Sequence, residues 1–370
     1  NDKVGEAFAH AANEAQLRVV GQQKKKKKEG APAGEVTFDA VFEVFPEVQI
    51  ADLADAEVER LSAEVNDAAI DKTVEILRKQ RRTFALRAQD AAAQDGDRVT
   101  VDFEGKIDGE LFAGGKAEDF QFLVGEGQML KEFEDAVRGM KVGESKTFPL
   151  AFPEDYHGKD VAGKTADFLV TVKKIEAAHL PEVNDALAKS LGVAEPTVEG
   201  LRADIKKNLE REVKFRLLNR NKQAVMEALV AKAQLDLPNA AIQAEIERLR
   251  DGARADLKQR GLKDADKAEI PDDIFRPQAE HRVRLGLVLA ELVRANNLQA
   301  TPEQLKAHID ELAASYEKPE DVVRWYFSDR QRLADVEAVV VENNVTDFVL
   351  SKVKVTDKTL SFEELMGQQA

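Results

Sequence analysis

The sequence contains no cysteine, and this absence excludes disulfide bonds and thiolate zinc sites. It also contains no apolar run close to the roughly 20 residues that cross a bilayer, and no signal-peptide core. We therefore expect a soluble chain without membrane attachment, and a cytoplasmic location is compatible with the lack of cysteine. Aromatic residues are scarce at 6%, whereas charged residues make up 33%, which favours well-solvated helices outside a small aromatic-rich region.

Positive charge is also in deficit, because the net charge is −15. This balance argues against a general nucleic-acid binder but leaves room for a local basic patch. A length of 370 residues exceeds one ordinary core, so two or three domains are expected. The chain begins at Asn1 within a helical pattern, and we expect a further segment to precede it.

Residues 97–176 carry the clearest pattern in the chain. Apolar residues alternate in three runs, which predicts antiparallel strands buried on one face: Val99, Val101 and Phe103; Phe120, Phe122 and Val124; Phe168, Val170 and Val172. Residues 129–140 instead space Leu130, Phe133, Val137 and Met140 at a helical step. Together these patterns predict a curved antiparallel sheet with one short helix.

The N-terminal region combines a helical pattern over residues 4–20 with a strand pattern over 36–44. Between them lies the lysine run Lys24–Lys28, which we expect in a flexible loop that continues through Gly30–Gly34. A solvated loop is the favoured interpretation of the run. The alternative is contact with the phosphates of a large RNA assembly, which salt would weaken steeply.

Helical patterns dominate the rest of the chain. Residues 52–88 predict a polar helical connector that needs another domain to cover its apolar stripe. Beyond Glu176 the pattern is helical almost to the end, with segments from Thr197 onward and over 241–259, 274–295, 303–316, 320–327 and 330–350. Isolated apolar residues on polar faces suit projecting helical arms better than a tight bundle.

Five motifs in the central stretch resemble the FKBP-like prolyl isomerases. They are V-x-V-x-F-x-G from Val99, D-G-x-x-F from Asp108, F-x-F-x-x-G from Phe120, M-x-x-G-E from Met140 and F-x-V-x-V from Phe168. Five further segments, four of them outside the stretch, extend the resemblance to the trigger factor family of ribosome-associated chaperones. These segments are FEVFPEV at 42–48, LRKQ at 77–80, PEDYHG at 153–158, TVEGLRADIKKNLERE at 197–212 and FEELMGQQA at 362–370.

The family resemblance implies a multi-domain α+β protein with four regions. Residues 1–50 would be the remainder of an N-terminal α+β ribosome-binding domain, and 51–95 a connector helix packing on the C-terminal domain. Residues 96–176 would form the FKBP-like isomerase domain, and 177–370 a large all-α chaperone domain with client-binding arms. The resemblance implies a ribosome contact through the N-terminal domain, although the family's docking motif G-F-R-x-G-K-x-P does not occur in these 370 residues. Docking is not carried over to the lysine run.

The same resemblance implies a cytoplasmic chaperone that binds unfolded or nascent polypeptides and catalyses cis/trans isomerisation of Xaa-Pro bonds. It implies no cofactor or metal, and a possible homodimer of the free protein. The first alternative is a non-catalytic holdase in which the FKBP-like domain is only a binding module or a structural module. A further alternative, an envelope isomerase with helical dimerisation arms, is disfavoured by the C-terminal segments.

Isomerisation requires an apolar, water-poor site, because a twisted amide is less polar than a planar one. By resemblance, the catalytic residues are Phe133 as the floor under the proline ring, Tyr156 with its hydroxyl near the substrate carbonyl, and Phe168. The substrate-binding residues are Phe103, Phe112, Phe120, Met129 and Leu130. These aromatics could instead be core residues only, the interpretation we favour for Phe122 and Phe148. His157 competes with Tyr156 for its role, and with no second histidine or cysteine nearby it predicts no metal site.

The sequence departs from the simplest FKBP relatives at two positions of the expected site. Ala113 stands where they have aspartate, and Glu132 where they have glycine. Binding of macrolide inhibitors is therefore not expected.

Overall fold

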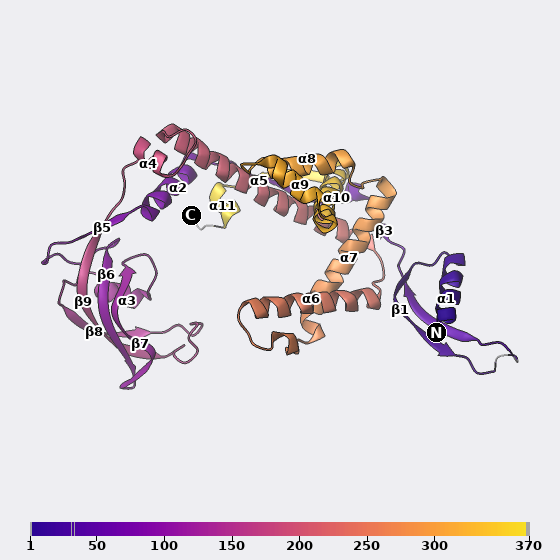
Figure 1. The fold of residues 1–370 in the computed structure, drawn as a ribbon, viewed down its shortest axis with the longest axis horizontal. Coiled ribbons are helices and arrows are strands. Elements are labelled where there is room, and N and C mark those ends of the chain that lie inside the picture. The colour runs from indigo at the N-terminus through magenta and orange to yellow at the C-terminus, as the bar shows by residue number, and fades with distance from the viewer. Residues whose placement is uncertain (1, 31, 33, 368–370) are drawn as a thin grey trace. The chain divides into compact units, whose positions relative to one another are not determined.

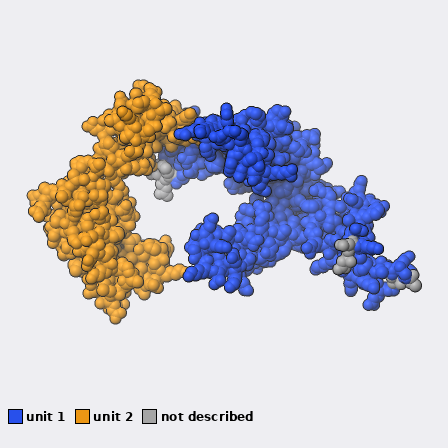
Figure 2. All heavy atoms as spheres, viewed as in Figure 1, with its two compact units in different colours: residues 1–64, 212–370 blue, residues 65–211 orange. Residues whose placement is uncertain are grey.

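The structure is a computed structural model that describes residues 2–30, 32 and 34–367. Residues 31 and 33 of the expected loop, and the last three residues of FEELMGQQA, lie outside the described part. The chain divides into two compact units, one of residues 1–64 and 212–370 and one of residues 65–211 (Figure 2). Because the first unit is built from both ends of the chain, the second is inserted within it.

Helices and strands follow one another along the chain as Figure 1 shows. The helices are α1 (Asp2–Glu14), α2 (Asp67–Gln80), α3 (Lys131–Val137), α4 (Asp185–Ser190), α5 (Val198–Ala231), α6 (Asn239–Gln259), α7 (Asp272–Asn296), α8 (Pro302–Ala313), α9 (Pro319–Phe327), α10 (Arg330–Lys352) and α11 (Phe362–Met366). The strands are β1 (Val19–Lys27), β2 (Phe38–Val44), β3 (Gln49–Ile50), β4 (Glu57–Ser62), β5 (Thr83–Leu86), β6 (Arg98–Ile107), β7 (Glu110–Leu123), β8 (Ser145–Ala151), β9 (Thr165–His179), β10 (Ala233–Gln234) and β11 (Lys354–Thr359). This content confirms the expected multi-domain α+β class.

The unit of residues 65–211 contains a five-stranded antiparallel sheet. Its strands follow the order β5-β9-β6-β7, and β8 also pairs with β9. Alternate residues of β6 and β9, such as Val101 and Val170, are fully buried against α3, as the two-residue period predicted. The sheet also includes β5, which lies in the region that the sequence indicated as a helical connector. Its four residues are too few to show a periodic pattern.

Helix α2 of the same unit packs against the start of α5. Ile70 and Val74 of α2 form a small core with Leu201 and Ile205 of α5. The side chain of Asn66 caps α2 by accepting the Ala69 N–H at 2.7 Å. In the same way Thr197, the expected cap of α5, accepts the Gly200 N–H at 3.0 Å.

The expectation of unbroken helical character over 52–88 is wrong for residues 57–62, which form β4. This strand pairs in parallel with β11, so the expectation of helix almost to the C-terminus is also wrong at residues 354–359. Arg60 and Asp357 join the two strands through a pair of hydrogen bonds of 2.7 and 3.2 Å. Each strand depends on a partner about 300 residues away in sequence, which no local pattern in either segment reveals.

The helical core of the other unit lies between α5, α7 and α10. Val225, Val288 and Val345 are fully buried there, one from each helix. Helices α6 and α7 form a separate pair around Ile246 and Ala279. Among the described residues no helix combines the length and the apolar character needed to cross a bilayer.

The lysine run lies in a strand, which corrects the expectation of a flexible loop. Lys24–Lys27 belong to β1 and pair with residues 38–41 of β2. Strand pairing uses backbone groups only, so charged side chains can occupy an edge strand while they remain in solvent. Helix α1 ends at Glu14, earlier than the expected Val20, and its Phe8 meets Phe42 of β2 edge to face with ring centroids 5.0 Å apart.

Candidate functional site

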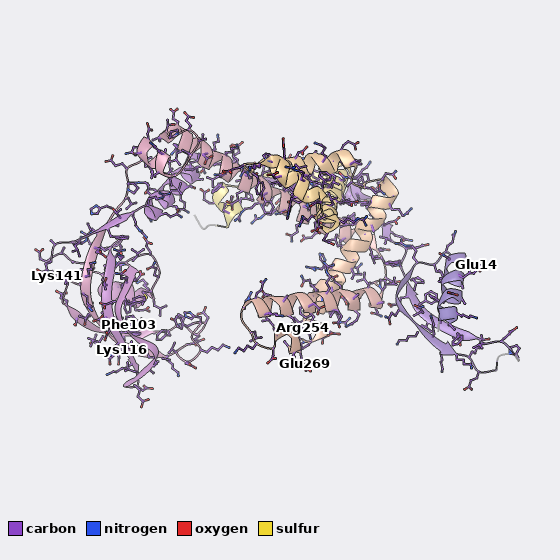
Figure 3. The ribbon with its side chains drawn as sticks, in the orientation of Figure 1. Glu14, Phe103, Lys116, Lys141, Arg254 and Glu269 are labelled. Atoms are coloured by element: carbon purple, nitrogen blue, oxygen red, sulfur yellow. The ribbon has the colours of Figure 1, made fainter. Side chains whose placement is uncertain are left out.

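The structure brings the predicted aromatic residues together on one face of the sheet. Strand β6 supplies Phe103, which Figure 3 marks on the sheet. Its ring centroid lies 5.5 Å from that of Phe133 on α3 and 5.6 Å from that of Phe120 on β7, both edge to face. Phe168 of β9 follows at 5.9 Å from Phe133. Edge-to-face geometry is the arrangement that aromatic pairs prefer, so these rings are well packed.

The predicted residues lie at two depths. Phe133 and Phe168 are only 1% and 5% exposed and form what we call the floor. The predicted residues that are half-buried and pack against that core form what we call the rim: Phe103, Phe112, Phe120, Met129, Leu130 and Tyr156. A ligand in contact with the rim would therefore meet apolar side chains that are fixed from below.

Tyr156 reaches the cluster through a residue that the sequence analysis missed. Its ring lies 4.9 Å from that of Phe152, which is buried and in turn lies 5.8 Å from Phe112. His157 is exposed with its ring 4.2 Å from Tyr156. Phe152 directly precedes the PEDYHG motif in the sequence. Its position at the edge of this motif was the sequence signal that could have identified it as a site residue.

Burial alone does not separate site residues from core residues. Phe122 and Phe148, which we assigned to the core, are buried much like Phe133 and contact it at 5.6 and 5.7 Å. Contact with the rim separates Phe133 from Phe148 but not from Phe122, whose ring stacks on Phe120 of the rim at 6.3 Å. Phe133 touches Phe103 of the rim, whereas the ring partners of Phe148 are the buried Phe133 and Phe168.

Asp102 and Lys173, two charged residues of the sheet next to the cluster, lie on its opposite face, whereas the buried carboxylate of Glu134 on α3 accepts the Met129 N–H. Asp102 precedes Phe103 on β6, and Lys173 is one residue from Val172 on β9, so the strand period turns both away from the rings. Lys173 donates to Asp119 at 2.5 Å, and this hydrogen bond raises the pKa of the lysine. In the part of the chain that the structure describes, no group of acidic or histidine side chains is placed to hold a metal ion. The aromatic face can therefore offer an apolar environment.

Gly105 of β6 is a second residue whose importance the sequence analysis missed. A Cβ at this position would lie 2.7 Å from two ring atoms of Phe168 and 3.0 Å from Phe112. A glycine inside a strand often marks such a close approach, and the motif V-x-V-x-F-x-G already contained this signal. The missing side chain leaves space in which floor and rim rings meet.

Replacing Gly105 with alanine should displace the Phe168 ring, which is buried and has little room to move. We expect a loss of about 1–3 kcal/mol in the free energy of unfolding, as for other overpacked cores, and lower isomerase activity. Thermal unfolding and a peptide isomerisation assay would measure both. The control is Gly252→Ala on α6, where nothing lies within 4 Å of the new Cβ; it should stabilise by about 0.5–1 kcal/mol. Equal stabilisation by both substitutions would contradict the close approach.

Three protein families match successive parts of the chain. Residues 1–77 match the family described as bacterial trigger factor protein, and residues 197–351 match the trigger factor C-terminus. Residues 89–173, which hold every predicted site residue, match the FKBP-type peptidyl-prolyl cis-trans isomerases.

Individual proteins are similar over the whole chain. Trigger factor of Paracidovorax citrulli is 84% identical over 368 residues, which cover 100% of this chain and 84% of that protein. Trigger factor of Variovorax paradoxus is 79% identical over 369 residues with the same coverage. The solved structure titled "Promiscuous Substrate Recognition in Folding and Assembly Activities of the Trigger Factor Chaperone" matches 95% of this chain and 83% of its own, with a TM-score of 0.45 and 19% identity.

Proposed function

Because this chain belongs to the bacterial trigger factor family, we propose that it isomerises Xaa-Pro bonds at the cluster formed by the floor and the rim. Family membership confirms the resemblance seen in the sequence, and the protein is a chaperone with an FKBP-type peptidyl-prolyl isomerase domain. The observation that carries the site assignment is the half-buried apolar rim packed over the buried Phe133 and Phe168.

Such a site lowers the barrier without a nucleophile or a metal. Rotation about an Xaa-Pro bond faces about 20 kcal/mol because the planar amide loses its resonance when it twists. The twisted amide is also less polar than the planar one, so an apolar surface that excludes water favours it. Phe133 would support the proline ring from below, with Phe168 beside it, and the Tyr156 hydroxyl would donate to the substrate carbonyl. Phe103, Phe112, Phe120, Met129 and Leu130 would enclose the residues around the proline.

Titration with a short Xaa-Pro peptide tests where the substrate binds. We expect the methyl resonances of Met129 and Leu130 to shift on addition of peptide, because both side chains belong to the rim. Methyl groups of the α6–α7 pair, such as those of Ile246, serve as the control and should not move with a peptide too short to span both regions. Resonance shifts confined to Ile246 and its neighbours would show that the peptide does not bind at the rim.

Client binding has its own structural support, apart from the isomerase site. Large apolar side chains lie in solvent on the helices, at Phe215, Trp325 and Phe327, and between α8 and α9, at Tyr316. Separate exposed apolar residues suit weak binding of many unfolded sequences. We infer that residues 177–370 hold clients and that residues 96–176 act on them. The non-catalytic holdase remains the second candidate function.

The remaining assignments follow from the family. We propose a cytoplasmic protein that binds nascent chains and contacts the ribosome through residues 1–50, with 51–95 as the connector. Dimerisation of the free protein is a further proposal, and sedimentation of the purified chain across a range of concentrations would test it.

A further inference from the structure

Residues 124–130 form the loop that carries two rim residues into helix α3. Gly125, Glu126 and Gly127 lie in a turn within this loop. From inside the domain the carboxylate of Glu134 accepts the Gly125 N–H at 3.2 Å and the Met129 N–H at 3.5 Å. Glu134 is only 6% exposed, so the inner side of the loop is fixed by a buried group.

The outer side of the loop is held by a residue from the connector. The guanidinium of Arg82 donates to both carboxylate oxygens of Glu126, at 2.5 and 3.1 Å. The two side chains are 14% and 30% exposed, and the hydrogen bond from Arg82 lowers the pKa of Glu126. Bidentate pairs of this kind are stronger and more directional than ordinary surface ion pairs.

Arg82 is itself fixed in place. It lies directly after the C-cap of α2, and its backbone N–H donates to the Lys79 carbonyl at 3.4 Å. Its guanidinium lies 5.6 Å from the ring centroid of Phe84, and that ring also holds the guanidinium of Arg98 at 4.2 Å. Phe84 belongs to β5, which is paired with β9 of the sheet. The donor is therefore oriented before it meets Glu126, which reduces the entropy that the ion pair costs.

Because the loop is held at Glu126, the rim residues that follow it in sequence are also held in place. Met129 and Leu130 follow Glu126 by three and four residues, and Leu130 is the N-cap of α3. The Leu130 carbonyl accepts the Phe133 N–H at 3.0 Å. A shift of the loop would therefore move two rim residues and the helical turn that places the floor.

We propose that Arg82 is a positioning residue for prolyl isomerisation, which holds the loop through Glu126 so that Met129 and Leu130 stand against Phe133. This inference rests on the site assigned under Proposed function. Arg82 lies outside residues 89–173, the part that matches the isomerase family. The isomerase site of this chain thus extends into the connector between α2 and β5.

Double-mutant kinetics on the full chain test this role. For a short Xaa-Pro peptide we expect Arg82→Ala and Glu126→Ala each to raise KM about three- to tenfold, with kcat changed less than about twofold. The double variant should be no worse than either single one, because both remove the same contact. Exchanging the charges, Arg82→Glu with Glu126→Arg, should bring KM back to within about twofold of the wild type. Thermal unfolding of each variant separates this role from a loss of stability alone, which would lower the active fraction and hence kcat rather than raise KM.

The matched control is Arg202→Ala, which removes a second arginine–carboxylate contact of the same unit, to Asp71 at 2.7 Å, without touching the loop. It should leave KM unchanged. Wild-type KM in both single variants, or effects that multiply in the double variant, would overturn the proposal. A wrong assignment of the isomerase site would be recognised by a different result. In that case Phe133→Leu would keep full activity, whether or not Arg82 is substituted.

Discussion

Replacing Phe133 with leucine should lower kcat/KM for a short Xaa-Pro peptide by about 10- to 100-fold, which corresponds to about 1.4–2.7 kcal/mol of transition-state stabilisation. Leucine keeps an apolar side chain at a position that is 1% exposed, so the domain should still fold. It removes the flat ring on which the proline would rest, together with the edge-to-face contact with Phe103. Coupled-protease or NMR exchange assays with the full chain would measure the loss.

Phe148→Leu is the matched control for this substitution. Phe148 is also buried and also contacts Phe133 and Phe168, but no rim ring contacts it among the described residues. Both variants should lose similar stability, about 1–3 kcal/mol, and thermal unfolding would verify the match. Only Phe133→Leu should lose substantial activity. Equal losses of activity would indicate that these rings are core residues and that the floor has been placed wrongly.

The second large expected effect is a dependence of the isomerase activity on the size of the substrate. A fragment of residues 65–211 should equal the full chain on a short peptide, yet fall about 100-fold behind it on an unfolded protein. Exposed apolar residues such as Phe215 and Trp325 lie outside the fragment, and a client bound to them would be tethered to the chain that carries the rim, which raises its effective concentration. Refolding of a protein limited by proline isomerisation supplies the second assay.

The fragment boundaries matter in this comparison. A fragment begun at residue 96 would lose β5 and Arg82, and a loss of activity could then be mistaken for a loss of client binding. Residues 65–211 keep both, along with the core between α2 and α5. If this fragment matches the full chain on the unfolded protein, the helices outside it do not deliver clients to the site. Inactivity of both on the peptide would favour the non-catalytic holdase.

The sheet of the isomerase domain was predictable because its signals are local. Val99, Val101 and Phe103 alternate within five residues, and burial of one face follows directly from that period. The helix caps were equally local, since Thr197 needs only the N–H group three residues ahead. Such features can be predicted without knowing which distant residues the fold places next to them.

Elements whose partners are distant in sequence were not predictable. Residues 57–62 read EVERLS, which continues a helical pattern as readily as it forms a strand, and only pairing with β11 decides the matter. The lysine run was missed for a different reason, because its partner β2 is the next strand along the chain and the lysine composition concealed the pairing. In both cases backbone hydrogen bonds to a partner strand outweighed the composition of the segment.

The same difference between local and distant signals applies to the residues of the candidate site. Its rings could be assigned from motifs, because the family places them at recognisable spacings. The groups that arrange those rings could not, because each acts on a residue from another element. Gly105 makes room for Phe168, Phe152 links Tyr156 to Phe112, and Arg82 reaches a loop 44 residues away in sequence.

The parallel pairing of β4 with β11 has a consequence for how the chain is made. The paired residues are 297 positions apart, as for Arg60 and Asp357, so the strand formed early in synthesis has no partner until almost the whole chain has been translated. The inserted residues 65–211 are complete long before that point and can fold on their own contacts. During its own synthesis this chaperone therefore leaves β4 without its strand partner until residues 354–359 have been translated.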